Sequence, residues 1–174
     1  IFGNDYGFLG LDSSFVHSPV TADLNNQSVW QVEGMKITQS LTLVEDKNNP
    51  NIGNVKISYQ VENTTDEAVQ IGSRMLLDTM LGPQDASPVS LSGSNEYLRM
   101  ETDVTDNLPY YWRAVDDPLV PDVMSYGFVR GWGEADPSRM IIGHWEGLSA
   151  TQWDYDVDPN LDFTIPNNRF GSAD

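Results

Sequence analysis

The 174-residue sequence contains no cysteine and only two histidines, His17 and His144. The absence of thiols excludes a disulfide scaffold and a cysteine nucleophile. It does not exclude export, because many exported bacterial proteins lack cysteine. A histidine-based zinc site would need carboxylates to complete it, and no carboxylate stands at a recognisable ligand spacing from either histidine.

Basic residues are also scarce: 9 Lys and Arg stand against 26 Asp and Glu, for a formal net charge of −17. Such a surface repels phosphate backbones, which argues against nucleic acid as a partner. An anionic membrane surface is disfavoured for the same reason, and no apolar run approaches the roughly 20 residues of a membrane span. The acidic composition is typical of solubility or of an affinity for cations.

Helical periodicity is missing, because no stretch of 12 or more residues repeats its apolar positions every 3.6 residues. Alternation with a period of two replaces it. Residues 55–62 predict a half-buried strand whose inner face carries four apolar side chains, Val55, Ile57, Tyr59 and Val61. In residues 30–43 the alternation shifts by one position at Gly34, which predicts a β-bulge within a single strand.

The segment 69–77 has two interpretations. As a strand it alternates and would form a hairpin with residues 55–62, since a six-residue turn joins the two. As a helix it would place Arg74 and Asp78 one turn apart, although Gly72 disfavours a helix interior. We predict the strand, in which Arg74 and Asp78 lie about 13 Å apart and do not pair.

Further strands are expected in residues 96–104, 123–133 and 138–148. Many alternating strands joined by turns predict an all-β fold, an antiparallel β-sandwich of super-sandwich or jelly-roll type with few or no helices. No linker divides the chain, so residues 1–174 are expected to form a single domain. The sequence begins at Ile1 and ends at Asp174 as if cut from a longer exported protein.

An acidic loop with oxygen-bearing side chains at every second position is the sharpest local motif. Its members are Asp154, Asp156, Asp158, Asn160 and Asp162. Ca²⁺ prefers six to eight oxygen ligands, so the loop is a candidate Ca²⁺ site. It is not an EF-hand, because Pro159 replaces the glycine of the sharp turn and Ile165 replaces the bidentate glutamate. The alternative is a solvated acidic loop.

Aromatic residues gather at Tyr110, Tyr111 and Trp112, in a segment rich in Pro and Asp that we interpret as a loop. Exposed aromatic rings stack on the apolar faces of sugars, and neighbouring polar groups bind the sugar hydroxyls. The candidate glycan-binding residues are therefore these three aromatics and four charged residues, Asp116, Arg74, Asp78 and Asp85. The alternative is that the aromatic rings fill the core.

Asp78 and Asp85 also suggest a catalytic alternative, because two carboxylates about 5 to 10 Å apart are the working groups of a glycosidase. Asp78 has a simpler interpretation as an acceptor of turn N–H groups. Arg74 lies in an apolar segment and needs a partner. That partner is either an acid of a neighbouring strand, in a structural ion pair, or a bound carboxylate or sugar.

Residues 54–89 resemble a family of uncharacterised bacterial surface and exported proteins, through the pattern VxNT…VGxRxxLDTxxGxxD. Residues 136–156 are similar to a second landmark of that family, although Ser138 precedes Arg139 where the pattern tends to have Asp. The resemblance implies a large β-sandwich similar to the super-sandwiches attached to carbohydrate-active enzymes. It implies no assigned activity, so it carries over no catalytic residue.

These observations together predict a non-catalytic extracellular or cell-surface module with a structural or adhesive function. Its expected partner is a glycan or another surface protein. Neither nucleic acid nor insertion into a membrane is expected. Apart from the candidate Ca²⁺, no cofactor is expected. A glycoside-processing enzyme domain that uses paired carboxylates is the alternative.

Overall fold

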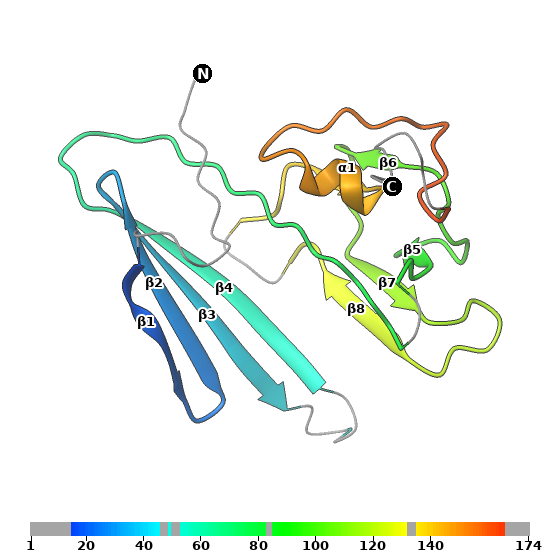
Figure 1. Cartoon of the computed structure of the whole chain (residues 1–174), viewed down its shortest axis with the longest axis horizontal. Coiled ribbons are helices and arrows are strands. Elements are labelled where there is room, and N and C mark those ends of the chain that lie inside the picture. Colours follow the sequence, from blue (N-terminus) through cyan, green and yellow to red (C-terminus); the bar gives the residue numbers. More distant parts are fainter. Residues whose placement is uncertain (1–14, 46–48, 50–52, 83–84, 132–134, 166–174) are drawn as a thin grey trace, which may run out of the picture. The chain divides into compact units, whose positions relative to one another are not determined.

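The computed structural model describes residues 15–45, 49, 53–82, 85–131 and 135–165. The chain divides into two compact units, Ile1–Ser73 and Arg74–Asp174, which are described separately (Figure 1). All pairings between the described strands are antiparallel, and the one described helix has five residues. This confirms the all-β prediction. No helix in the described ranges is long and apolar enough to cross a membrane.

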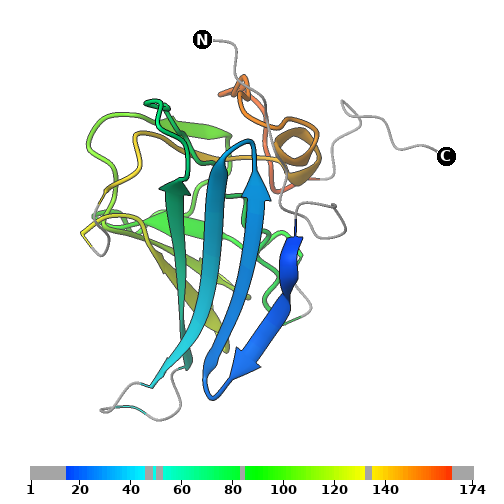
Figure 2. The same ribbon diagram turned by 90° about the vertical axis from the view of Figure 1, so that its left-hand side faces the viewer.

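The first unit is a four-stranded meander in which each strand pairs with the next along the chain (Figure 2). Its strands are β1 (Phe15–Ala22), β2 (Asn25–Val32), β3 (Met35–Glu45) and β4 (Gly53–Asn63). The β3–β4 pair is regular over its whole length, from Met35 opposite Asn63 to Glu45 opposite Gly53. β-Branched and aromatic residues alternate with polar ones here, as expected for a pleated sheet.

Gly34 lies in a hairpin turn and not in a β-bulge, so that prediction was wrong. Val32 pairs with Met35, and the two residues between them, Glu33 and Gly34, have φ values of 43° and 77°. Two positive φ angles in a two-residue loop are typical of a type I′ turn, whose twist matches that of the two flanking strands. A Cβ at position 34 would also overlap the methyl group of Thr65. The shift in alternation therefore marks the change from one strand to the next.

The predicted strand at residues 55–62 is confirmed as β4, but its apolar side chains are exposed. Its predicted hairpin partner is absent: residues 69–77 form neither a strand nor a helix, and β4 pairs with β3 alone among the described residues. The chain leaves β4 through a turn in which Asn63 Oδ1 accepts hydrogen bonds from the N–H and the hydroxyl of Thr65. The predicted hairpin was therefore wrong.

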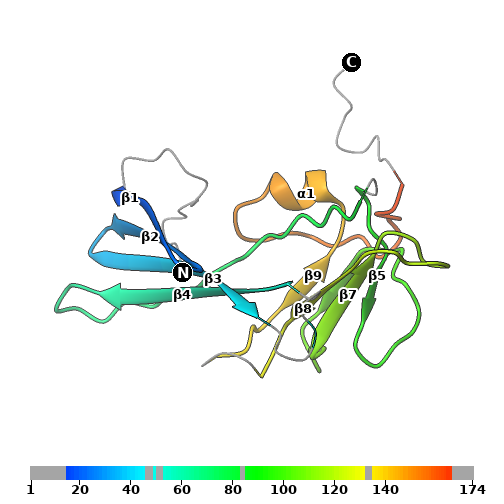
Figure 3. The same cartoon turned by 90° about the horizontal axis from the view of Figure 1, so that it is seen from below.

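The described part of the second unit contains two small sheets and the helix. One sheet has the order β5-β7-β8, formed by β5 (Val89–Leu91), β7 (Tyr111–Val115) and β8 (Met124–Phe128). The other pairs β6 (Thr102–Val104) with β9 (Met140–Ile142). The helix α1 (Trp145–Ser149) follows β9 (Figure 3). Ala114 and Val115 at the end of β7 are completely buried and mark the core of this unit.

The strands predicted for the second unit are confirmed in part. β8 lies within the predicted 123–133 segment, and β6 occupies only the end of the predicted 96–104 strand. Of the predicted 138–148 strand, only β9 is extended, because α1 begins at Trp145. A five-residue helix is too short to show a 3.6-residue period, which explains why residues 145–148 were predicted as strand.

Candidate functional site

The carboxylate of Glu101 is buried, with the residue 2% exposed. Its Oε1 accepts hydrogen bonds from the Tyr155 hydroxyl at 2.6 Å and from the His144 N–H at 3.1 Å. Its Oε2 accepts one from the Asp158 N–H at 2.9 Å. A buried carboxylate is tolerated only when such donors replace its water. Glu101 thus ties the start of α1 to the acidic loop.

Arg139 and Asp103 form a two-pronged ion pair beside Glu101. Arg139 Nε donates to Asp103 Oδ1 at 3.0 Å, and Nη2 donates to Oδ2 at 2.9 Å. Nη2 also donates to the carbonyl of Tyr155 at 3.1 Å. The hydrogen bond to Asp103 raises the pKa of Arg139 above its usual value. Arg139, which immediately precedes β9, therefore holds β6 and the acidic loop together.

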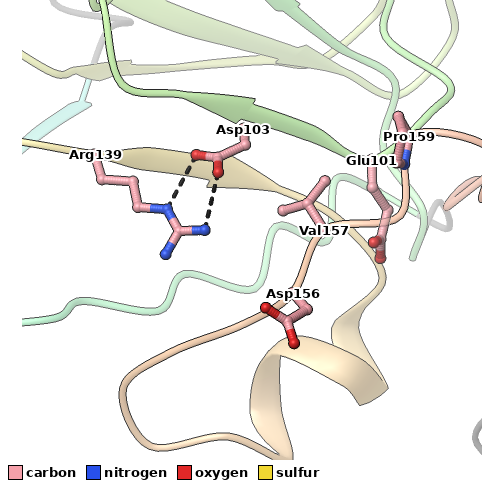
Figure 4. Close-up of a pocket in the computed structure, with 6 residues that line it drawn as sticks. All are labelled: Glu101, Asp103, Arg139, Asp156, Val157 and Pro159. Carbon is pink, nitrogen blue, oxygen red and sulfur yellow. Dashed lines mark hydrogen bonds and ion pairs between the residues drawn. The ribbon is translucent and has the colours of Figure 1, made fainter.

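These groups border an open hollow of about 410 Å³ (Figure 4). Its lining residues are Glu101, Asp103, Arg139, Asp156, Val157 and Pro159. The hollow is polar, but the oxygens of Glu101 and Asp103 already accept hydrogen bonds from the protein. Sequence reasoning did not select Glu101, Asp103 or Arg139 as site residues. No local pattern marked them, because their partners lie 16 to 57 positions away in the chain.

Two carboxylates of the acidic loop accept hydrogen bonds from nearby residues of the chain. Asp158 Oδ1 accepts the N–H of Asn160 at 3.0 Å. Asp162 Oδ1 accepts the hydroxyl and the N–H of Thr164, and its Oδ2 pairs with Arg99 at 2.7 Å. The hydrogen bond from the Thr164 hydroxyl is the largest cause of a lowered pKa of Asp162.

The remaining members of the candidate Ca²⁺ site are Asp154 and Asp156. Asp154 is exposed and lies 3.9 Å from Arg139. Asp156 lines the hollow. In the parts of the chain that the structure describes, no group of three or more Asp, Glu or His residues is placed to hold a metal ion. The Ca²⁺ site remains a prediction of the sequence.

Arg74 binds the turn that follows α1. Its Nη2 donates to the carbonyl of Leu148 at 2.7 Å, and its Nη1 donates to the carbonyl of Thr151 at 2.7 Å and to that of Trp153 at 3.3 Å. A cation that donates to the last carbonyls of a helix is a favourable C-terminal cap. Within the described residues, Arg74 therefore has main-chain partners in place of the expected acid, and it is not paired with Asp78.

Trp112 lies in β7, so its predicted location in a loop was wrong. It is half-buried and stands opposite Gly127 of β8. A Cβ on Gly127 would overlap the indole ring, so the ring packs directly against the glycine. One face of Trp112 is thus covered by the neighbouring strand.

The opposite face of the same strand pair presents three aromatic rings, Tyr111, Tyr126 and Phe128, which we name the aromatic strip. Tyr111 stands opposite Phe128 and contacts both other rings edge to face, with centroids 5.8 Å from Tyr126 and 6.4 Å from Phe128. Tyr126 is 49% exposed and Phe128 is 57% exposed. The strip is an apolar surface that spans the central strand β7 and the edge strand β8, and its two tyrosines carry phenolic hydroxyls.

The other proposed ligand-binding residues lie apart from the strip. Tyr110 is exposed, and the guanidinium of Arg130 lies 4.1 Å from its ring centroid, a cation–π contact. Asp78 and Asp85 are exposed in segments without regular structure. Asp116 accepts hydrogen bonds from N–H groups of the loop between β7 and β8. The hydrogen bond from Val123 is the largest cause of its lowered pKa. Of the seven predicted residues, only Tyr111 belongs to the strip.

Comparison of the chain with protein-family models, with curated proteins and with solved structures finds no match.

Proposed function

We propose that the chain is a non-catalytic extracellular module of a bacterial surface protein, and that it binds glycans through the aromatic strip. The strip is the observation that carries this proposal. Three contacting rings present exposed apolar surface, and sugar rings offer apolar C–H faces that stack on such surfaces. Location at the cell surface rests on the resemblance of residues 54–89 and 136–156 to exported proteins.

Polar groups beside the strip supply partners for sugar hydroxyls. The guanidinium of Arg113 lies on the same face as Tyr111 and is held by the Ser90 hydroxyl at 3.2 Å. It also lies 5.5 Å from the ring of Tyr97. A guanidinium held in place in this way can donate to a sugar hydroxyl at little further entropic cost. The strip and Arg113 therefore combine stacking with hydrogen bonding, the usual composition of a glycan-binding surface.

Two of the three carboxylates that line the hollow, those of Glu101 and Asp103, support a non-catalytic function. A glycosidase needs one carboxyl that can give its proton and one that can attack or activate water. Glu101 accepts three hydrogen bonds from the protein, and Asp103 is locked to Arg139. Neither carboxylate is available for that chemistry without breaking the contacts that hold the unit together.

Calorimetric titration with a panel of soluble polysaccharides tests the proposal. At least one glycan class is expected to bind saturably, and the double variant Tyr126→Ala/Phe128→Ala should bind it at least tenfold more weakly. Tyr59→Ala is the matched control, because Tyr59 is a similarly exposed tyrosine of β4 in the first unit. Equal binding by the double variant, or no binding across the panel, would contradict the proposal.

A further inference from the structure

The loop between β7 and β8 places two adjacent apolar side chains at its tip. Leu119 is 88% exposed and Val120 is 73% exposed, more than any other large apolar residue in the described ranges. Single exposed apolar residues are ordinary on protein surfaces. Two neighbours this exposed on one loop are not explained by packing, since neither contributes much to the core of the unit.

The backbone of this loop is fixed by two carboxylates. Asp116 Oδ1 accepts the N–H groups of Asp117, Asp122 and Val123 at 2.9 to 3.0 Å. Asp117 Oδ1 accepts the N–H groups of Leu119 at 2.7 Å and Val120 at 3.1 Å.

The other two residues of the 117–123 loop are Pro118 and Pro121, which have no N–H. Every main-chain donor of the loop is therefore used within it. Proline also restricts the backbone before binding, so little conformational entropy remains to be lost when the tip is bound. In Figure 1 the loop extends beyond the ends of β7 and β8. Leu119 and Val120 thus form an apolar knob on a preorganised support.

We propose that this knob docks into an apolar socket on a partner protein whose rim carries Lys or Arg. The negative charge of the loop is the reason for inferring a basic rim on the partner. Asp116, Asp117 and Asp122 flank the two apolar residues in the sequence, and no basic residue lies in 116–123. A basic rim would complement these acids, whereas an acidic rim would repel them.

A lipid surface fits the knob less well. Membrane-binding loops place Trp, Tyr, Lys or Arg beside their apolar residues, whereas this loop has carboxylates there. Burying two apolar side chains in the headgroup region would bring three carboxylates to the membrane. The protein's net charge of −17 adds repulsion from anionic lipids.

Selection from a phage-displayed library of random dodecapeptides on the whole chain tests the proposal. We expect enrichment of peptides that combine an apolar cluster with Lys or Arg. The double variant Leu119→Ser/Val120→Ser should bind them at least tenfold more weakly, and raised salt should weaken their binding to the native chain. Leu77→Ser is the control, because Leu77 is also exposed in the second unit, and it should bind as the native chain does.

Four results would overturn the proposal: no enrichment, enrichment without basic residues, equal binding by the double variant, or equal loss in the Leu77→Ser control. A parallel sedimentation assay with phosphatidylcholine vesicles tests the lipid alternative. Binding to these vesicles that the double variant loses would assign the knob to a membrane. Circular dichroism of each variant verifies that its fold is unchanged, which is expected for such exposed positions.

Discussion

The hydroxyl of Tyr155 donates a hydrogen bond of 2.6 Å to the carboxylate of Glu101, and both residues are buried. The two lie 54 positions apart in the chain, so the bond closes a long loop. Because the oxygen of Glu101 is shielded from water, the loss of a donor is not compensated by solvent. Substitutions at Glu101 and Tyr155 should therefore lower the stability of the second unit.

Tyr155→Phe is expected to lower the free energy of unfolding by about 1–3 kcal/mol, the usual range for a hydrogen bond to a buried charged group. Among the described residues, Glu101 Oε1 would then keep only the N–H of His144 as a donor. Glu101→Ala should cost more, because it leaves three donors without their acceptor. Urea unfolding followed by circular dichroism measures both effects. Glu96→Ala, at an exposed position, serves as the control and should change stability by less than about 0.5 kcal/mol.

Arg74→Lys is expected to destabilise the second unit by about 1–3 kcal/mol, because lysine cannot reproduce the fork that reaches several carbonyls at once. Arg99→Lys is the matched control, since Arg99 forms a surface ion pair with Asp162 that is worth about 1 kcal/mol or less. Urea unfolding of the two variants should separate them. Equal stabilities would mean that Arg74 is not a structural cap.

Gly127→Ala is expected to displace the indole of Trp112, because the added methyl group would overlap it. Overpacking of this kind typically costs about 1–3 kcal/mol. Near-ultraviolet circular dichroism should also change as the ring moves. Gly53→Ala provides the control, since nothing lies within 4 Å of the Cβ it would add. An unchanged spectrum for Gly127→Ala would contradict the placement of Trp112.

Acid should destabilise the protein through Asp116 and Asp162, whose pKa values are lowered by hydrogen bonds from Val123 N–H and from the Thr164 hydroxyl. A carboxyl whose pKa is lower in the folded state adds stability at pH values above the unfolded value, here 3.8. That contribution disappears as the pH falls through the lower, folded value. Urea midpoints at pH 7 and pH 3 measure the effect, and Asp162→Asn should reduce the difference between them.

Millimolar Ca²⁺ distinguishes the Ca²⁺ site that the sequence predicts from its alternative, a solvated acidic loop. The described carboxylates do not gather into a metal-binding group, which favours the solvated loop and an unchanged melting temperature. A ligand that binds only the folded state would raise the melting temperature. Differential scanning calorimetry with Ca²⁺ and then with EDTA makes the comparison. A rise that EDTA reverses would confirm the Ca²⁺ site that the sequence predicts at residues 154–162.

The sequence predicted elements whose pattern is local. Alternation over 55–61 was sufficient to identify β4, and a short apolar run identified β8. Gly34 shows the limit of this reasoning, since a one-residue shift in alternation has the same appearance for a bulge and for a tight turn.

Contacts between distant residues decided the rest. Residues 69–77 alternate like a strand, but Arg74 binds carbonyls 74 to 79 positions further along the chain. No local pattern contains that information. The aromatic strip was missed in the same way, because Tyr111 meets Tyr126 and Phe128 only when β7 and β8 pair. The sequence identified Tyr111 as a candidate binding residue, but not Tyr126 or Phe128.

Arg74 is also the first residue of the second compact unit. The point at which that unit begins therefore coincides with the side chain that closes the end of α1. A polypeptide shortened to start at residue 75 would omit no described strand or helix of the second unit, yet it would remove the guanidinium that donates to the carbonyls of Leu148 and Thr151. The useful boundary for producing this unit alone is thus set by a hydrogen-bonding side chain and lies before residue 74.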